Sequence, residues 1–243
     1  MNPSSHRTCD PAGNQLLAAL PAAERARWLV HLELIELRGG QLLCESGREP
    51  SHAVFPTSAI VSMQYWANEG ASTECAVIGS DGVVGLSLFL GGNAALSRMV
   101  VQTAGQAWRL PATALKQPAS AVSPLLSVVL RYAMTIVAQV AQVAACNRFH
   151  SIDQRLARRL LLAMDQSLSA DLAMTQETVA GLLGVRREAV TTAALKLQRA
   201  GVIRYRRGHV EVIDRAHLES LACECYSADH RTCKRALPAA VAM

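Results

Sequence analysis

Over residues 174–213 the sequence indicates two short helices, a glycine turn and a basic hairpin that follow one another without a gap, and few folds accommodate that order. The hydroxyl of Thr175 can cap a first helix, whose apolar residues recur at helical spacing up to Gly184. Gly184 tolerates the left-handed backbone that a sharp turn between helices requires. A second helix is therefore predicted from Arg186 to about Ala200.

A β-hairpin with a basic tip is predicted directly after the second helix. Residues 202–205 and 209–213 alternate apolar with polar side chains, and the turn between them carries Arg206 and Arg207. From Arg186 to Arg207 the chain holds seven Lys or Arg and one acid. A charged helix start or an arginine-rich turn is typical of any solvated surface, but helix, turn, helix and basic wing in this order indicate a winged helix-turn-helix that binds DNA.

The second helix begins with residue types that read bases. An arginine can bond both acceptors on a guanine edge and a glutamate can accept from cytosine, so we expect Arg187 and Glu188 to read bases in a major groove. Thr191 and Thr192 lie one turn further on, where they can contact a thymine methyl group or a phosphate. The remaining candidate DNA contacts are phosphate clamps: Gln176, Arg186, Arg206 and Arg207.

The region from residue 33 to residue 110 consists of short apolar runs broken by glycine and turn residues. Many short strands at such spacing favour a barrel or a roll. The candidate strands are 33–37, 41–44, 52–55, 59–65, 72–78, 97–102 and 106–110.

A long apolar helix is predicted to begin near residue 123 or 124 and to end at a joint over 149–151, after which a further helix spans 152–166. Its apolar residues recur every three or four positions, the spacing of a coiled-coil seam that needs a partner helix. Packing on the chain's own β-roll is the alternative. Arg131, Gln139 and Gln142 interrupt the apolar run, which favours a buried helix over a membrane span. The candidate interface residues are Leu126, Val129, Ala133, Ile136, Val140 and Val143.

The chain resembles the CRP/FNR family of bacterial transcription regulators. In the C-terminal part the resemblance rests on residues 175–177, 182–190, 201–203 and 207–208, and upstream on residues 20–24, 37–40, 45–47, 54–56 and 79–85. It implies an α+β homodimer in which an N-terminal β-roll like that of cyclic-nucleotide-binding domains, a long dimerisation helix and a winged helix-turn-helix follow one another. The expected domains are the roll over 1–120, the helix over 121–150, the DNA-binding domain over 151–226 and a mobile tail over 227–243.

Family membership implies double-stranded DNA and a second copy of the chain as partners, with RNA polymerase as a further candidate. One departure affects the operator: the family commonly places Ser or Thr where Arg186 stands, and a second arginine near Thr192. The operator therefore need not be the family's usual sequence. Neither the target genes nor the sign of regulation follows from the residues.

The phosphate cassette of the family is altered in this chain. Members that bind cyclic AMP carry a Gly-Glu pair for the ribose and an Arg followed by Ser or Thr for the cyclic phosphate, whose buried charge needs such a cation. Here leucine follows Gly85, and Arg98 comes after Ser97. The hydroxyl residues that would meet the purine are replaced near Val140. We therefore expect no cyclic AMP at this site, and Gly85, Ser97 and Arg98 are the candidate contacts for any other effector.

The seven cysteines raise a metal or redox option. The oxygen-sensing branch of the family has closely spaced cysteines near its amino terminus, whereas this chain has Cys9 alone there, so no iron–sulfur cluster is expected. Cys223, Cys225, His230 and Cys233 approximate zinc ligands, but their irregular spacing favours unliganded thiols. No metal or other cofactor is predicted, and the role of these cysteines stays open. The remaining cysteines fall in apolar runs and are interpreted as core residues: Cys44, Cys75 and Cys146.

Charge and composition agree with a DNA-binding C-terminal half. The net charge is +5; residues 1–150 hold 10 basic and 9 acidic groups, whereas residues 151–243 hold 14 and 10. The excess of basic groups therefore lies in the part of the chain that is expected to contact DNA phosphates. The amino terminus is polar and lacks the apolar core of a signal peptide, which predicts a cytoplasmic protein.

No nucleophile elbow, phosphate loop or paired metal-ligand motif indicates an enzyme. The rival hypothesis is a regulatory module that binds a small molecule or a protein and does not read DNA.

Overall fold

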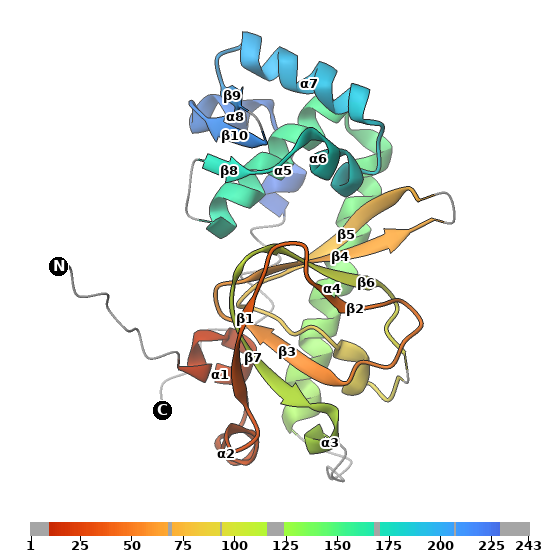
Figure 1. The fold of residues 1–243 in the computed structure, drawn as a ribbon, viewed down its shortest axis with the longest axis vertical. Helices are drawn as coiled ribbons and strands as arrows, with labels where there is room; N and C mark the ends of the chain where they lie inside the picture. Colours follow the sequence, from red (N-terminus) through yellow and green to blue (C-terminus); the bar gives the residue numbers. More distant parts are fainter. Residues whose placement is uncertain are drawn as a thin grey trace, which may run out of the picture.

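The computed structural model describes residues 10–67, 70–92, 94–115, 124–167, 171–206 and 208–228 of the 243-residue chain. A β-roll and a mainly helical domain are stacked along the long axis, and one long helix, α4 (Pro124–Phe149), runs beside the roll up to the helical domain (Figure 1). This is the α+β architecture that the sequence predicts.

The β-roll is built from two antiparallel sheets, of strand orders β1-β7-β3 and β2-β6-β4-β5. Each of the seven strands predicted from the sequence is present, with ends within one residue of the predicted ones. An isolated bridge between Val54 and Val84 ties the segment after β5 to the first sheet. The strands are β1 (Glu33–Leu37), β2 (Leu42–Cys44), β3 (His52–Pro56), β4 (Ile60–Trp66), β5 (Ser72–Ile78), β6 (Arg98–Thr103) and β7 (Gly105–Pro111).

Short helical segments that the sequence analysis did not predict cover the ends of the roll. The buried side chain of Asn14 caps α1 (Gln15–Ala18) by accepting from the backbone N–H groups of Leu16 and Leu17, and its amide donates to the carbonyls of Pro56 and Gly82. One side chain thus fixes the amino-terminal segment to the roll. The segments are η1 (Pro11–Gly13), α1 (Gln15–Ala18), α2 (Ala22–Leu29), η2 (Leu86–Leu88) and α3 (Ala112–Leu115).

Three aromatic rings of the roll pack against one another in its core. Trp28 lies with its ring centroid 6.2 Å from that of Phe55 and 5.8 Å from that of Phe89. α4 closes this core with Val128 and with Tyr132, whose hydroxyl donates to the carbonyl of Val83 at 3.1 Å. Since those side chains are buried by the roll, one face of α4 belongs to the chain's own core.

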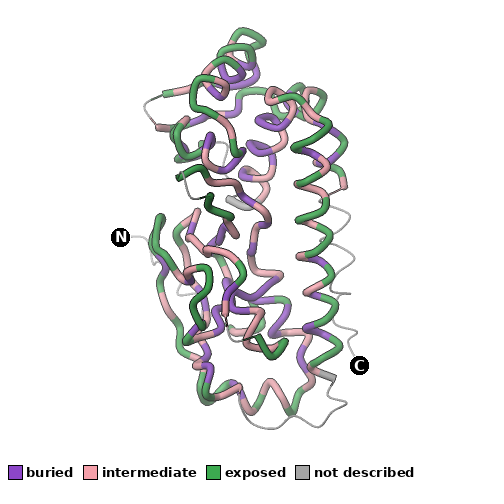
Figure 2. The backbone as a smooth tube through the Cα atoms, turned by 90° about the vertical axis from the view of Figure 1, so that its right-hand side faces the viewer, coloured by how far each residue is buried: buried purple, intermediate pink, exposed green. Residues whose placement is uncertain are grey.

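The opposite face of α4 is exposed and apolar (Figure 2). The predicted interface residues lie on both faces of α4. The helix is apolar on both sides, so the spacing of its apolar residues does not show which side packs on the roll. Val129 is only 1% exposed and Ile136 packs against the core of the roll, so neither is available to a partner helix. Ala133 and Val143 are half-buried, and Leu126 and Val140 are exposed.

α4 has the length and composition of a helix that could cross a membrane, and 22% of its most apolar stretch is buried inside this chain. The buried part is the side that carries Val128 and Tyr132. Its contacts with the roll are those of a helix that closes a folded domain.

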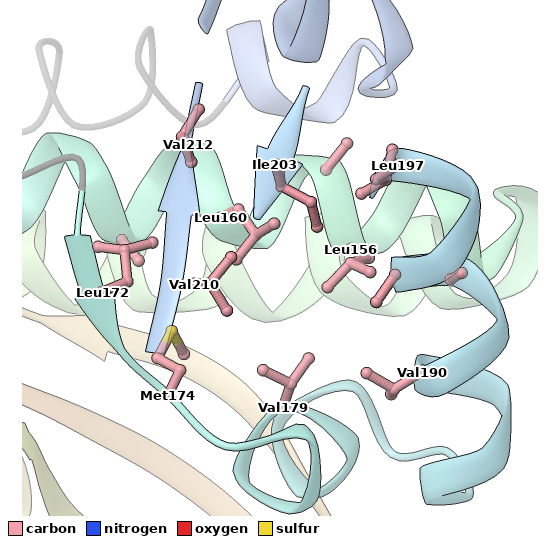
Figure 3. Close-up of a cluster of buried hydrophobic side chains, with 14 of the residues drawn as sticks. Leu156, Leu160, Leu172, Met174, Val179, Val190, Leu197, Ile203, Val210 and Val212 are labelled. Carbon is pink, nitrogen blue, oxygen red and sulfur yellow. The ribbon is translucent and has the colours of Figure 1, made fainter. Parts of the chain in front are cut away.

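The C-terminal domain combines helices with a small antiparallel sheet of order β8-β10-β9. Its core is formed by side chains from every part of the domain (Figure 3), among them Leu156, Leu160, Leu172, Val179, Val190, Leu197 and Val210. The predicted helices and hairpin are confirmed, whereas β8 and α8 were not predicted. The elements are α5 (Ile152–Ser167), β8 (Asp171–Ala173), α6 (Gln176–Leu183), α7 (Arg187–Arg199), β9 (Ile203–Arg206), β10 (His209–Val212) and α8 (Arg215–Leu221). The tail expected over 227–243 lies outside the described residues from 229 onward.

The C-terminal domain packs directly on the roll where α6 meets β5. Ser72 Oγ donates to the carbonyl of Gly181 at 3.2 Å. A Cβ atom at Gly184 would lie 3.0 Å from Cβ and Oγ1 of Thr73. Glycine at these positions lets the helix approach the strand this closely.

A buried ion pair lies behind this contact and joins the same two domains. Arg159 Nε of α5 is 3.2 Å from Glu74 Oε1 of β5, and both side chains are buried. Ser62 Oγ donates to the other carboxylate oxygen at 2.6 Å. Arg155, also on α5, donates to the carbonyl of Leu183 at the end of α6. Arg155 and Arg159 of α5 therefore make their contacts inside the protein.

Candidate nucleic-acid interface

The turn between α6 and α7 is shaped by local hydrogen bonds. Thr175 Oγ1 accepts from the backbone N–H of Thr178 at 3.0 Å and so caps α6, as predicted. At the other end Gly184 has φ +64°, and the N–H of Val185 donates to the carbonyl of Ala180 at 3.1 Å. The chain thereby reverses direction within a few residues and starts α7 across α6.

α7 presents its polar first turn to solvent because its apolar side is buried in the domain core. Val190 and Ala194 are buried, whereas Arg186, Arg187 and Glu188 are exposed. Among the residues that the structure describes, no acidic side chain pairs with Arg186 or Arg187. Both guanidinium groups are therefore free to meet an anionic partner.

The hydroxyl residues of α7 lie beside the predicted base readers. Thr191 Oγ1 donates to Gln176 Oε1 at 2.7 Å, which links α7 to the start of α6. Thr192 is exposed, and its Oγ1 donates to the carbonyl of Glu188 at 3.0 Å. The candidate contacts of the two helices thus share one surface, although Thr191 and Gln176 are already bound to each other.

The wing formed by β9 and β10 carries exposed cationic side chains. Arg206 is exposed at the end of β9 and has no acidic partner among the described residues. Arg204 pairs with Glu211 across the hairpin, Nη1 to Oε2 3.0 Å. Arg207, the other predicted clamp of the wing, lies outside the described residues.

Tyr205 fixes the wing to the helix-turn-helix. Its hydroxyl donates to the carbonyl of Met174, just before α6, at 3.2 Å, and its backbone N–H donates to Gln198 Oε1 of α7 at 2.8 Å. Burial raises the pKa of Tyr205 to about 12, so the phenol stays protonated and keeps donating at neutral pH. The wing is therefore held at a fixed angle to α7.

A cavity of about 800 Å³ lies in the roll, between the second sheet, the η2 segment and α4. Gly85 and Ser97 of the candidate effector contacts line it, but Arg98 does not. The Arg98 guanidinium lies over the Trp66 ring, 4.6 Å from its centroid, and its Nε is 3.6 Å from Glu45 Oε2. Within the described part of the chain, no Asp, Glu, Lys or Arg lines the cavity. Its chemistry is that of an apolar pocket.

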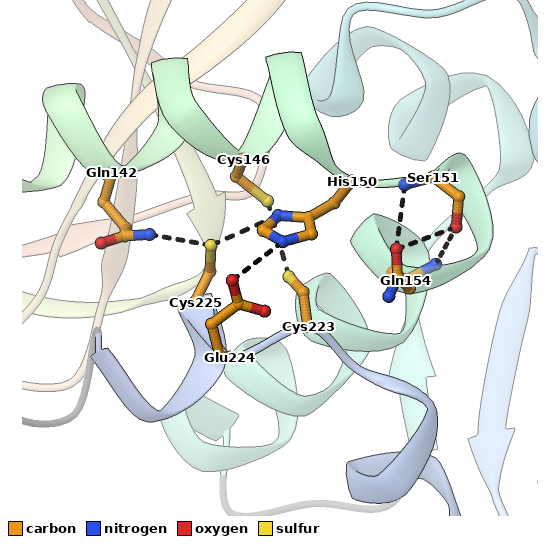
Figure 4. A network of polar contacts seen from close by, with 8 residues as sticks. All are labelled: Gln142, Cys146, His150, Ser151, Gln154, Cys223, Glu224 and Cys225. Carbon is orange, nitrogen blue, oxygen red and sulfur yellow. Dashed lines mark hydrogen bonds and ion pairs between the residues drawn. The ribbon is translucent and has the colours of Figure 1, made fainter.

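A cluster of three cysteines and one histidine, which the sequence does not predict, lies at the joint between α4 and α5. Cys223 and Cys225, which follow α8, lie against Cys146 and His150 at the end of α4 (Figure 4). The hydrogen bond between Cys146 and Cys223 raises the pKa of the Cys146 thiol and lowers that of Cys223. His230 and Cys233, which the sequence grouped with Cys223 and Cys225, lie outside the described residues. Spacing in the sequence could not reveal a group whose halves are more than 70 positions apart.

A β-roll, a long helix along it and a winged helix-turn-helix with a free cationic face define a two-domain DNA-binding regulator. Residues 154–221 match the family model of the Crp-like helix-turn-helix domain. This match covers α5, α6, α7 and the wing.

Solved structures of CRP/FNR regulators have the same fold over most of the chain. A transcriptional regulator of this family from Eubacterium rectale is 20% identical, with a TM-score of 0.72 over 85% of this chain and 96% of that one. A second, from Thermus thermophilus, is 21% identical, with a TM-score of 0.66 over 78% and 98%. The c-di-GMP-responsive global regulator CLP of Xanthomonas campestris is 18% identical, with a TM-score of 0.64 over 80% and 100%.

Residues 154–221 thus match the Crp-like helix-turn-helix domain, and the whole chain has the fold of the CRP/FNR transcription regulators. The family resemblance seen in the sequence is confirmed. These structural neighbours are transcription regulators and not enzymes. No curated protein matches the sequence of this chain.

Proposed function

We propose that the protein is a homodimeric regulator that binds an inverted-repeat operator through α7. The observation that carries the proposal is the exposed first turn of α7, where Arg187 and Glu188 stand without acidic or basic partners among the described residues. An arginine and a glutamate at the start of a recognition helix are suited to guanine and cytosine edges. Two such helices related by a dyad contact half-sites ~34 Å apart.

Phosphate contacts flank the base readers in this proposal. Arg186 precedes α7 and Arg206 lies on the wing, so a cation stands on each side of the reading helix, and Arg207 stays a candidate clamp from the sequence. Phosphate contacts position a protein on the duplex and make its affinity depend on salt. Gln176, at the start of α6, is a further phosphate contact once DNA competes for the hydrogen bond that it accepts from Thr191.

The proposed dimer forms through the exposed face of α4. Five large apolar side chains on this face, between 38% and 65% exposed, stand where a partner helix would cover them. They repeat at the three- and four-residue spacing of a helix seam. These residues are Leu126, Leu130, Met134, Val137 and Val140. Leu126 and Val140 belong to the interface predicted from sequence, and the other three replace the residues that face the roll.

The sensor is proposed to bind no cyclic nucleotide and to hold no cofactor of the iron–sulfur kind. A cyclic phosphate needs a cation in its pocket, whereas the nearest candidate, Arg98, already binds Glu45 and Trp66 outside it. The apolar lining suits an apolar effector instead. In the assembled dimer, the partner's α4 would close the cavity where Val137 and Val140 line it.

A cytoplasmic location and contact with RNA polymerase complete the proposal, because a transcription regulator acts where DNA is transcribed. The competing function is a module that binds a small molecule or a protein and does not read DNA. Salt-dependent binding to a palindromic duplex separates the two, since the competing function predicts only weak background.

The test is selection of bound sequences from genomic fragments by the full-length protein. We expect enrichment of fragments that share an inverted repeat, and the selection is repeated with metabolite extract to find an effector that changes occupancy. A protein with Arg187→Ala and Arg206→Ala together serves as the matched control and should enrich no such repeat. Failure of the native protein to enrich any common sequence would remove the proposed function.

A further inference from the structure

Four potential metal ligands converge at the joint between the sensor and the DNA-binding domain. Cys146 lies near the end of α4, His150 at the α4–α5 joint, and Cys223 and Cys225 directly after α8 (Figure 4). Their ligand atoms, three Sγ and one imidazole nitrogen, all lie within 4.8 Å of one another. The topology therefore brings a Cys₃His set together from segments more than 70 residues apart.

The spacing of these atoms fits a single tetrahedral ion. Cys146 Sγ is 3.6 Å from Cys223 Sγ, and Cys225 Sγ is 3.5 Å from His150 Nδ1. Zinc bonds sulfur at ~2.3 Å and nitrogen at ~2.0 Å, so neighbouring ligands in a zinc tetrahedron lie ~3.5–3.8 Å apart. These two pairs are already at the separations that one ion imposes, and every other pair lies within 4.8 Å, so small side-chain rotations complete the tetrahedron.

The histidine is held in the orientation that a ligand needs. Its Nδ1 faces the sulfur atoms, and its Nε2 is 3.1 Å from Glu224 Oε1. Metal-bound histidines usually donate their second ring N–H to a carboxylate or carbonyl, which fixes the tautomer. Glu224 occupies that position here.

The surroundings of the sulfur atoms suit a thiolate site. Cys146, Cys223 and Cys225 are between 1% and 4% exposed and form a buried cluster of their own, separate from the apolar cores. Gln142 Nε2 donates to Cys225 Sγ at 2.8 Å. A zinc ion with three thiolates carries one net negative charge, and the positive charges of Arg155 and Arg158 act on Cys146.

We propose that Cys146, His150, Cys223 and Cys225 bind one zinc ion as a closed structural site. On binding, the three thiols release their protons to solvent, and the neutral imidazole coordinates through Nδ1. With four protein ligands the ion has no open position for a substrate, so its role is to fix the segment after α8 to the α4–α5 joint. The site departs from the sequence-based expectation of unliganded thiols, and it uses only half of the ligand group considered there.

The experiment measures metal content in the full-length protein, independently of DNA binding. The protein is expressed in zinc-supplemented medium, purified under reducing conditions without chelators and analysed by mass spectrometry for zinc per chain. We expect one zinc per chain in the native protein and a loss of stoichiometric zinc in Cys146→Ser and Cys223→Ser. Cys75→Ser, which changes a cysteine of the roll, is the matched control and keeps the ion, as does Cys233→Ser.

Cobalt substitution provides a readout that does not depend on any variant folding well. Protein stripped of zinc and titrated with Co²⁺ should develop the thiolate charge-transfer and tetrahedral d–d absorption bands at one equivalent. Glu224→Gln should keep these bands but weaken zinc affinity ~10–100-fold in competition with a chelator.

Three results would overturn the assignment. They are zinc far below one per chain in the native protein, a cobalt spectrum without thiolate bands, and a metal-free native protein with a Cys146–Cys223 disulfide. The last would instead make the pair a redox site. Each result can be obtained whether or not the operator proposal holds, so the two fail separately.

Discussion

At the scale of single residues, two exposed arginines on different elements should have different roles: Arg187 should read a base, and Arg206 should bind a phosphate. Arg187→Ala should weaken binding to the operator by ~1–3 kcal/mol and relax specificity at one base pair, because it removes a bidentate contact. Arg206→Ala should weaken all sequences alike and lower the salt slope by ~1, because it removes a phosphate contact. Binding to single-base operator variants across a salt series measures both. Unchanged affinities in both variants would exclude α7 and the wing as the interface.

Two Arg–Glu ion pairs should differ widely in their contribution to the free energy of unfolding, because one is buried and the other is exposed. Arg159→Ala leaves Glu74 charged and buried without its partner, so the free energy of unfolding should fall by ~3–5 kcal/mol. Arg109→Ala breaks the exposed pair with Glu33 and should cost at most ~1 kcal/mol. Denaturant unfolding of the two variants gives the comparison. Equal losses would mean that Glu74 is solvated or paired differently in solution.

At the scale of elements, two glycines with a left-handed backbone flank α7, and replacing Gly184 should cost more stability than replacing Gly201. Gly201→Ala meets open space, so only the left-handed backbone at φ +72° is strained, at ~1–2 kcal/mol. Gly184→Ala adds a contact at 3.0 Å with Thr73 to the same strain and should cost more. Thermal unfolding of both variants measures the difference. If the two alanines cost the same, α6 and β5 are not packed this closely in solution.

The exposed face of α4 should control assembly. Val137→Glu puts a charge in the middle of the proposed seam, where Val137 is 57% exposed, and should convert dimer to monomer at micromolar concentration because a buried unpaired charge is costly. Light scattering after size-exclusion chromatography measures the mass. Val30→Glu changes an apolar residue that is 79% exposed beside α2 and should leave the mass unchanged. A monomeric native protein would contradict the dimer outright.

The elements that the sequence predicted well are those whose signal is local. Short apolar runs broken by glycine and turn residues located all seven strands of the roll, and Thr175 and Gly184 marked both ends of α6 because capping depends on a few adjacent residues. β8 was missed because it has only three residues and depends on pairing with β10. Spacing did not separate the two faces of α4, since Val129, which is buried, and Ile136, which packs against the core of the roll, share the helical spacing with residues on the exposed face.

At the scale of the whole molecule, the candidate sites differ in how far they could be read from the sequence. The candidate DNA contacts lie within 32 positions, from Gln176 to Arg207, and the order of helix, turn, helix and wing over them indicated a helix-turn-helix regulator. The cluster of Cys146, His150, Cys223 and Cys225 exists only once the chain returns from α8 to the end of α4. No periodicity or spacing encodes that return, which is why Cys146 was interpreted as an ordinary core residue.

The cavity of the roll leads to a prediction about the intact protein. Cyclic AMP should leave its melting temperature unchanged, because a ligand stabilises only by binding the folded state and this cavity offers no cation to a phosphate. Thermal unfolding with millimolar cyclic AMP measures this, with cyclic GMP as a matched nucleotide. A concentration-dependent rise that disappears in Arg98→Ala would show that Arg98 leaves Glu45 and enters the cavity.

The close contact of α6 with β5 limits how far the two domains can be exchanged as modules. A Cβ atom at Gly181 would lie 3.1 Å from Ser72 Oγ and one at Gly184 would lie 3.0 Å from Thr73 Oγ1, so the α6 side of the contact has little room for a side chain. A chimera that joins this DNA-binding domain to another regulator's roll would need small residues on the recipient strand. Compatibility between the roll and the helix-turn-helix domain thus depends on Gly181, Gly184, Ser72 and Thr73, none of which is a proposed DNA contact.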